Sequence, residues 1–208
     1  MIEKEEICMA RERKVSTESK IISAAWNLFY KYGYDKTTVD EIIEMSGIAK
    51  STFYHYFKNK DELLSTLSTL FDDKYCSLAD ELDESMNSFD KLLYLNKEVF
   101  NMIDESVNRE LMASLYSSQL VTKGQRHLLD QNRIYYKLLM KIISEGQSKG
   151  EIINDFSSQE LVNIYAMCER AFIYEWCINK ERTSIKEYST RILPLFLYKF
   201  RTEAIESL

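Results

Sequence analysis

Residues that break helices are scarce in this chain, which has one proline and five glycines in 208 residues. Strands joined by tight turns need glycine and proline far more often, so this scarcity predicts an all-α fold. Apolar residues make up 45% of the chain and aromatic residues 12%. A chain of this composition can bury a packed core and is not expected to be disordered.

The stretch from residue 38 to residue 60 carries the signals of two short helices joined by a turn. Thr38 and Glu41 have the spacing of a capping box, which predicts the start of a helix. Gly47 supplies the turn, and a second helix is expected over residues 50–57. Because that helix is too short to be stable alone, its neighbours must hold it. The pattern is that of a helix-turn-helix, whose second helix enters the DNA major groove.

Charge supports this interpretation only locally. The formal net charge is −6, and residues 1–70 carry ten Lys or Arg against eleven Asp or Glu. Between Ser46 and Lys60, however, there are three lysines and no acid. Since the screening length near physiological salt is about 8 Å, a local basic surface can act in an acidic protein.

Residues 1–15 are expected to be a flexible charged tail, because they show no helical periodicity. Arg11, Arg13 and Lys14 gather basic charge near its end. Two interpretations therefore remain open, a solvated tail or a basic arm that contacts phosphate or the minor groove.

Beyond the first domain, long amphipathic helices separated by short polar breaks are expected. Their expected ranges are 60–85, 88–105, 108–121, 124–149, 157–180 and 184–205. The predicted fold is therefore all-α, with an N-terminal three-helix helix-turn-helix domain, a larger C-terminal helical bundle and about nine helices in total.

The last helix has an unusual apolar distribution. From Ile192 to Leu197 it is apolar nearly all the way round, which one packing face cannot satisfy. A second buried surface is therefore expected, and association of two copies of the chain would supply it.

Many positions between residue 17 and about residue 66 follow one known pattern. They are Phe29, Tyr30, Lys31, Tyr32, Gly33, Tyr34, Thr37, Thr38, Val39, Ile42, Gly47, Ile48, Ser51, Thr52, Phe53, Tyr54, Tyr56, Phe57, Lys58, Asn59, Lys60, Glu62, Leu63 and Leu64. This quarter of the chain resembles the DNA-binding domain of the TetR family of bacterial transcriptional regulators. It departs from the family at Ala49, where a polar cap is common. Losing that cap would cost about 0.5 to 2 kcal/mol unless Ser51 or tertiary contacts replace it.

The resemblance implies that the chain binds a double-stranded DNA operator as a homodimer through its last two helices. Tyr54 and Lys60 are then the expected backbone contacts, while Lys50, Ser51 and His55 are expected to reach base edges. Other interpretations stay open, because Tyr54 and Tyr56 could pack against the fourth helix and His55 could be a plain surface residue. The full predicted DNA-binding set is Thr38, Lys50, Ser51, Thr52, Tyr54, His55, Tyr56, Lys58 and Lys60.

The C-terminal region is larger than dimerisation requires and rich in aromatic and sulfur-containing side chains, although each of these is individually expected in a core. With the resemblance, they suggest a cavity for a small apolar or aromatic effector. Within the penultimate helix, Glu169, Arg170 and Glu175 could contact a ligand, but an interhelical ion pair is the preferred interpretation. The predicted effector residues are Tyr94, Phe100, Met112, Tyr116, Tyr136, Cys168, Phe172 and Trp176.

Other classes of function find little support in the sequence. The four cysteines and two histidines lack metal-ligand spacing, and no catalytic or nucleotide-binding motif occurs. We therefore expect no enzyme activity, no metal and no cofactor. The chain has no run of 18 uncharged apolar residues and begins with a charged segment, so no membrane partner and a cytoplasmic location are expected.

Together these patterns predict a ligand-responsive transcriptional regulator, in particular a repressor of a palindromic operator that an effector releases. The expected domains are a tail over 1–15, a helix-turn-helix domain over 16–62, and a ligand-binding and dimerisation domain over 63–208. The alternatives are a helical protein-interaction factor and an architectural DNA-binding factor, neither with a small-molecule effector.

Overall fold

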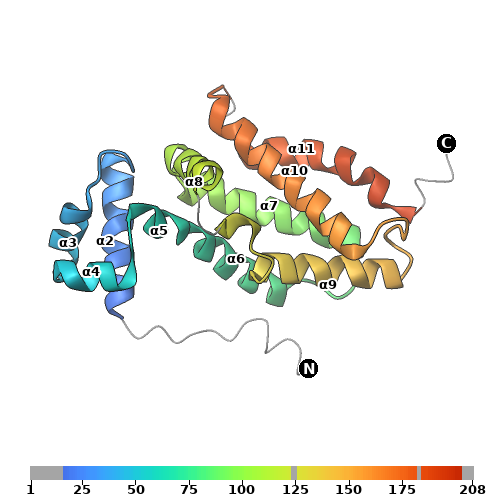
Figure 1. Cartoon of the computed structure of the whole chain (residues 1–208). Helices are drawn as coiled ribbons and strands as arrows, with labels where there is room; N and C mark the ends of the chain where they lie inside the picture. The colour runs from blue at the N-terminus through green and yellow to red at the C-terminus, as the bar shows by residue number, and fades with distance from the viewer. Residues whose placement is uncertain (1–15, 123–125, 182–183, 203–208) are drawn as a thin grey trace. The chain divides into compact units, whose positions relative to one another are not determined.

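The computed structural model describes residues 16–122, 126–181 and 184–202, and within these ranges the chain is almost entirely helical (Figure 1). The predicted all-α fold is confirmed. The tail predicted over 1–15 lies outside the described residues. The α-helices are α2 (Thr17–Tyr32), α3 (Val39–Ser46), α4 (Lys50–Tyr56), α5 (Lys60–Ser65), α6 (Leu67–Glu81), α7 (Ser88–Ser106), α8 (Arg109–Val121), α9 (Ile134–Ser148), α10 (Ser158–Ile178) and α11 (Ile185–Leu197), and the short 3-10 turns are η1 (His127–Leu129) and η2 (Tyr198–Phe200).

These elements form two compact units. The first unit contains residues 16–70 and 108–129, so it joins α2 to α5 with α8 and η1. The second unit contains residues 71–107 and 130–202, with α7, α9, α10, α11 and η2. Helix α6 begins in the first unit and continues in the second.

The first unit has its core where α2, α3, α4 and α5 meet. Phe29, Ile42, Phe53 and Leu63 are fully buried there, one from each helix. The predicted capping box at the start of α3 is confirmed, because the Thr38 hydroxyl accepts from the Glu41 amide and the Glu41 carboxylate accepts from the Thr38 amide at 2.7 Å. Gly47 follows α3 in the left-handed conformation that the tight turn before α4 requires.

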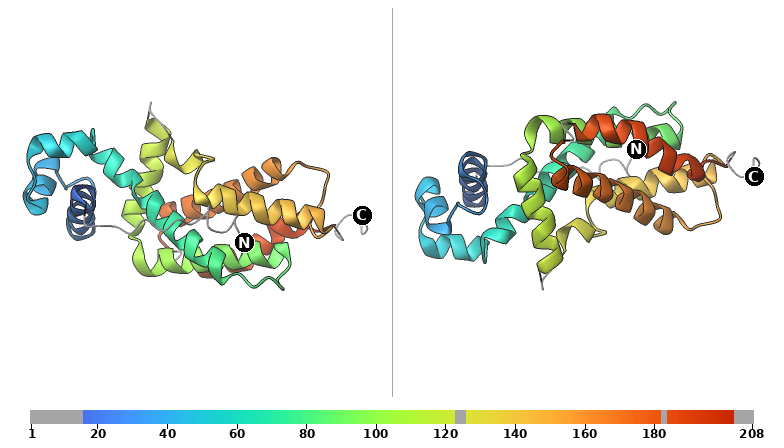
Figure 2. Two further views of the ribbon diagram at one scale, coloured as in Figure 1. Left: turned by 90° about the horizontal axis from the view of Figure 1, so that it is seen from below. Right: turned by 90° about the horizontal axis from the view of Figure 1, so that it is seen from above.

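The second unit is a bundle in which α7 packs along α11 and α9 packs along α10 (Figures 1 and 2). Its core is apolar and includes Leu92, Leu95, Leu139, Ile143 and, at the centre of α10, Tyr165, all with almost no exposed surface. The bundle buries most of the apolar positions that gave α7, α9 and α10 their predicted helical periodicity.

Three of the helix ranges predicted after residue 57 are wrong. The helix expected over 60–85 is interrupted at Thr66, whose hydroxyl donates to the Leu63 carbonyl at 2.6 Å and accepts from the Trp26 indole at 3.1 Å. The helix expected over 124–149 begins only at Ile134. At its start, the Asp72 carboxylate accepts a hydrogen bond from the guanidinium of Arg133, the residue before the helix, and another from the Tyr135 amide at 3.4 Å.

The third wrong boundary is the end of the last helix, expected at residue 205. Helix α11 ends at Leu197, and η2 follows. The chain then pairs with the segment before α10, since the Ile153 amide donates to the Phe200 carbonyl at 3.0 Å and Ile152 bridges to Arg201. This pairing requires extended backbone, which stops the helix.

Candidate nucleic-acid interface and effector region

Helix α4 is anchored by aromatic packing. Phe53 is fully buried and Phe57 nearly so, and their ring centroids lie 6.1 Å apart. Phe53 also contacts the Tyr54 ring edge to face at 5.3 Å. Because a seven-residue helix is marginal by itself, the burial of Phe53 and Phe57 in the core is what fixes its position in the first unit.

The predicted DNA-binding residues of α4 are mostly open to solvent. Lys50, Ser51 and His55 are exposed, and Tyr54 and Tyr56 keep 49% and 41% of their surface. Thr52 is half-buried, while Thr38 is exposed at the start of α3. No side chain caps α4, as the sequence departure at Ala49 implied. The helix therefore presents polar and aromatic side chains outward from a buried anchor.

The Lys50 ammonium is engaged on the outer surface of the first unit. It donates to the Asp40 carboxylate of α3 at 2.9 Å, and both side chains are largely exposed. This hydrogen bond raises the pKa of Lys50. A candidate base-reading lysine is thus paired with an acid of the preceding helix, a partner that the sequence pattern did not indicate.

The Lys60 ammonium is also hydrogen-bonded, but to backbone carbonyls of the same unit. It donates to the Tyr34 carbonyl at 2.7 Å and to the Thr37 carbonyl at 2.9 Å, and it lies 4.2 Å from the centre of the Tyr34 ring. Lys58, by contrast, is highly exposed and its ammonium lies 3.9 Å from the Glu62 carboxylate. The role of Lys58 and Lys60 at phosphate stays a prediction.

The predicted effector residues are divided between the two units. Met112 and Tyr116 lie on α8 and belong to the first unit. The other six lie in the second unit, where Phe100 and Phe172 bring their ring centroids to 6.5 Å. Tyr94, Tyr116 and Cys168 are half-buried, and the remaining five are buried.

The second unit also contains a buried carboxylate, Glu169, whose hydrogen-bond partners the sequence pattern did not indicate. Glu169 of α10 is 4% exposed, and its carboxylate accepts from the Tyr135 hydroxyl at 2.6 Å and from the Asn96 amide at 2.8 Å. The Tyr75 hydroxyl lies 3.5 Å away. Four helices, α6, α7, α9 and α10, therefore meet at one carboxylate.

This arrangement corrects the preferred interpretation of Glu169 and Arg170. Glu169 binds neutral hydroxyl and amide groups and is not ion-paired within the described ranges, while the Arg170 guanidinium donates to the Tyr136 hydroxyl at 3.2 Å. Burial raises the pKa of Glu169, against hydrogen bonds that lower it. The sequence shows charged residues inside an apolar helix, but it does not show their hydrogen-bond partners, which are distant in sequence.

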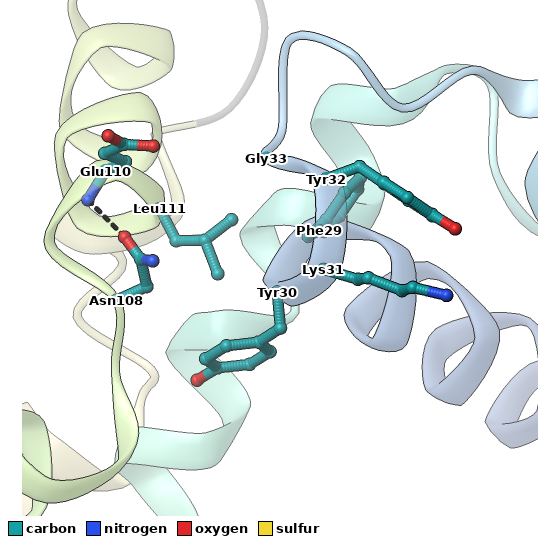
Figure 3. A pocket seen from close by; sticks show the side chains of 8 residues that line it. All are labelled: Phe29, Tyr30, Lys31, Tyr32, Gly33, Asn108, Glu110 and Leu111. Carbon is teal, nitrogen blue, oxygen red and sulfur yellow. Dashed lines mark hydrogen bonds between the residues drawn. The ribbon is translucent and has the colours of Figure 1, made fainter.

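A cavity of about 190 Å³ lies in the first unit, between the last turn of α2 and the first turn of α8 (Figure 3). Leu111 projects from α8 toward the end of α2, and the Asn108 side chain accepts from the Glu110 amide at 2.7 Å. The cavity shares no residue with the predicted effector set. It is lined by Phe29, Tyr30, Lys31, Tyr32, Gly33, Asn108, Glu110 and Leu111.

Membrane-spanning helices and metal clusters are both missing from the described part of the chain. None of its helices is long and apolar enough to span a membrane. In the same ranges, no group of three or more His, Cys, Asp or Glu side chains is placed to hold a metal ion.

Comparison with known proteins relates the chain to bacterial regulators. A family model described as "Bacterial regulatory proteins, tetR family" matches residues 21–67. The chain is 22% identical over 182 residues to the fatty acid metabolism regulator protein of Bacillus subtilis, covering 86% of this chain and 92% of that protein. It is 27% identical over 154 residues to the transcriptional regulator TtgR of Pseudomonas putida, covering 68% and 73%.

Solved structures of similar fold include two FadR proteins. FadR from Bacillus subtilis in complex with stearoyl-CoA matches with a TM-score of 0.64 and 22% identity, covering 88% of this chain and 98% of that one. FadR from Thermus thermophilus, a TetR-family repressor in complex with lauroyl-CoA, matches with a TM-score of 0.66 and 19% identity, covering 88% and 94%. At these identities the likeness establishes a shared fold.

Proposed function

The chain belongs to the TetR family of bacterial transcriptional regulators, and from this premise we propose that it represses a palindromic operator as a homodimer and is released by an effector. Residues 16–62 are assigned to DNA binding and residues 63–208 to effector binding and dimerisation. The observation that carries the proposal is the build of α4, in which the buried Phe53 anchors a short helix with outward polar and aromatic side chains.

In this proposal α4 lies in the major groove of each half-site. Lys50, Ser51 and His55 are exposed and of the types that contact base edges, and Tyr54 carries a hydroxyl that can donate to phosphate. Thr38, Thr52, Tyr56, Lys58 and Lys60 complete the proposed contact set. Because the protein would be two-fold symmetric, its half-sites should be spaced by one or more helical turns of DNA.

The proposed dimer partner is a second copy of the chain, bound through α10 and α11. Met167, Tyr174 and Ile178 lie at helical spacing on α10, and each keeps 57% of its surface. On α11, Leu195 and Phe196 keep 70% and 57%. Apolar exposure of this extent on adjacent helices is typical of a protein interface. The apolar side chains within residues 192–197 that stay exposed in one protomer would thus be buried in the dimer.

The proposed effector is a small, largely apolar or aromatic molecule bound in the C-terminal domain. The second unit supplies aromatic side chains for such a site, among them Phe100 and Phe172, whose ring centroids lie 6.5 Å apart. The two FadR structures hold acyl-CoA molecules, which makes long-chain acyl thioesters the first probes to use. An effector that couples to DNA binding by about 1 to 3 kcal/mol would release the operator about 5- to 150-fold.

A gel-shift titration tests the regulatory proposal. Full-length protein is incubated with DNA from upstream of its own gene at several salt concentrations, together with shuffled DNA of equal length. We expect a tighter complex with the upstream DNA, weakened steeply by salt because phosphate contacts release counterions. Equal binding to both DNAs, or none, would reject operator recognition.

Thermal denaturation with stearoyl-CoA, lauroyl-CoA and a panel of neutral aromatic compounds tests the effector. A true effector should stabilise the protein, by about 2.7 kcal/mol at a concentration of 100 times its Kd, and should also release the gel-shift complex. If every stabilising compound left the complex intact, the effector part of the proposal would fail while DNA binding stood.

A further inference from the structure

The turn between α2 and α3 decides how the helix-turn-helix begins. Gly33 leaves α2 with a φ of +85°, and Thr38 then caps α3. Residues 34–37 between them have no regular secondary structure. Any movement of this turn changes the direction in which α3 starts, and α4 follows α3 after a short turn. What holds the turn is therefore important for operator recognition.

Lys60, the first residue of α5, holds this turn in place. Its ammonium donates to the carbonyls of Tyr34 and Thr37 at 2.7 and 2.9 Å, so two of its three N–H groups serve backbone acceptors. It also lies 4.2 Å from the centre of the Tyr34 ring, within the range of a cation–π contact. Hydrogen bonds from a charged donor are stronger than neutral ones, which favours a fixed geometry.

Tyr34 makes the second connection between the same two segments. Its hydroxyl donates to the carboxylate of Asp61, the residue after Lys60. Its ring packs against Phe29 of α2, with centroids 5.2 Å apart. Burial and the Asp61 hydrogen bond both raise the pKa of Tyr34, so the hydroxyl keeps its proton and remains a donor. Lys60 at the start of α5 thus binds the turn, and Tyr34 in the turn binds the start of α5.

We propose that Lys60 and Tyr34 are positioning residues for operator recognition, which lock the turn before α3 to the first turn of α5. The inference rests on the proposed function. It assigns Lys60 a role inside the protein, in addition to any phosphate contact through its third N–H. Because Lys60 is the first residue of α5 and binds the turn, a reorientation of α5 would also move the start of α3.

Tyr34→Phe is the informative substitution, because it deletes the bond to Asp61 but keeps the ring and removes no positive charge. Tyr32→Phe is the matched control, since the Tyr32 side chain is exposed two residues earlier. Operator and shuffled DNA are titrated by fluorescence anisotropy over a range of salt, at a temperature where both variants are fully folded. Lys60→Met and the double variant complete a mutant cycle.

For Tyr34→Phe we expect operator affinity to fall about tenfold, because losing one hydrogen bond to a charged group lowers the population of the binding-competent turn by about that factor. Affinity for shuffled DNA and the salt slope should stay at the wild-type values, because no phosphate contact is lost. The double variant should lose less affinity than the product of the two single effects, since both act through one turn. Wild-type operator affinity in Tyr34→Phe, or fully independent effects, would overturn the inference.

Hydrogen exchange of the free protein separates this inference from the proposed function. Amides of residues 37–43 should exchange faster in Tyr34→Phe than in Tyr32→Phe, whether or not the wild type binds an operator. If the wild type binds no operator, the proposed function fails, and equal exchange in the two variants would reject the lock independently.

Discussion

The Glu169 carboxylate accepts a hydrogen bond of 2.6 Å from the Tyr135 hydroxyl, which joins α10 to α9 inside the second unit. The Asn96 amide adds a bond from α7, and Tyr75 of α6 lies close by. Buried charge is costly unless hydrogen-bonded, so this cluster selects one packing of four helices. It also makes the stability of the domain depend on pH.

The direction of that pH dependence follows from the raised pKa of Glu169. The folded protein holds this proton to a higher pH than the unfolded chain, so the contribution of Glu169 to the free energy of unfolding falls as pH rises through the raised value. Glu169→Gln has no such titration. Urea unfolding of both proteins from about pH 4 to about pH 8 should show the wild type losing stability relative to the variant. If the free energy of unfolding of the wild type minus that of the variant stayed constant or rose with pH, the raised pKa of Glu169 would be contradicted.

Arg133 and Asp72 form the second polar connection to α6. Two guanidinium nitrogens each lie 3.0 Å from a different carboxylate oxygen, and the two side chains are only 11% and 16% exposed. Arg133→Ala should therefore lower the free energy of unfolding by about 2 to 4 kcal/mol, because it strands a largely buried carboxylate.

The Lys97–Glu98 pair, which is more open to solvent than Arg133 and Asp72, provides the comparison for Arg133. Lys97→Ala should change the free energy of unfolding by no more than about 0.5 kcal/mol in the same urea titration. Arg133→Lys should not restore stability, since an ammonium cannot make both bonds in one plane. Equal effects of Arg133→Ala and Lys97→Ala would contradict the structural role of the pair.

The dimer surface is tested by Leu195→Asp. Leu195 is 70% exposed in the protomer, so the substitution should leave the helix folded while placing a charge in the proposed interface. Light scattering after size exclusion should then give a monomer where the wild type gives a dimer. Leu120→Asp is the control, because Leu120 is 78% exposed on α8 and lies outside that surface. A dimer in both variants would exclude this face.

Asp40→Asn should strengthen binding to DNA that lacks the operator sequence. The substitution frees the Lys50 ammonium from its 2.9 Å partner and removes a negative charge near the proposed groove contact. Affinity for shuffled DNA should rise several-fold, and its salt slope should steepen by about one ion per subunit. Glu44→Gln makes the same charge change on α3 without freeing Lys50. Equal behaviour of the two variants in the anisotropy titration would show that charge alone matters.

Local signals allowed much of the first unit to be predicted from sequence. The capping box of Thr38 and Glu41 and the turn at Gly47 depend on neighbouring residues only, and both are confirmed. The missing cap at Ala49 was equally visible, because it is also a local property.

The second unit was less predictable because its decisive contacts join distant residues. The start of α9 depends on Asp72, 61 residues before Arg133, and the surroundings of Glu169 depend on Asn96, 73 residues away. Helical periodicity identifies a buried face but not its partner. The inward engagement of Lys60 was missed for the same reason, since its acceptors lie 26 and 23 residues earlier.

Operator binding by Tyr54→Ala tests the central claim most directly. Tyr54 is 49% exposed on α4, and Tyr32, with 48% exposure on α2, gives a matched control. In an anisotropy titration with the upstream DNA, Tyr54→Ala should lose about tenfold or more in affinity while remaining a folded dimer, and Tyr32→Ala should bind as the wild type does. Wild-type affinity in Tyr54→Ala would contradict the placement of α4 in the groove.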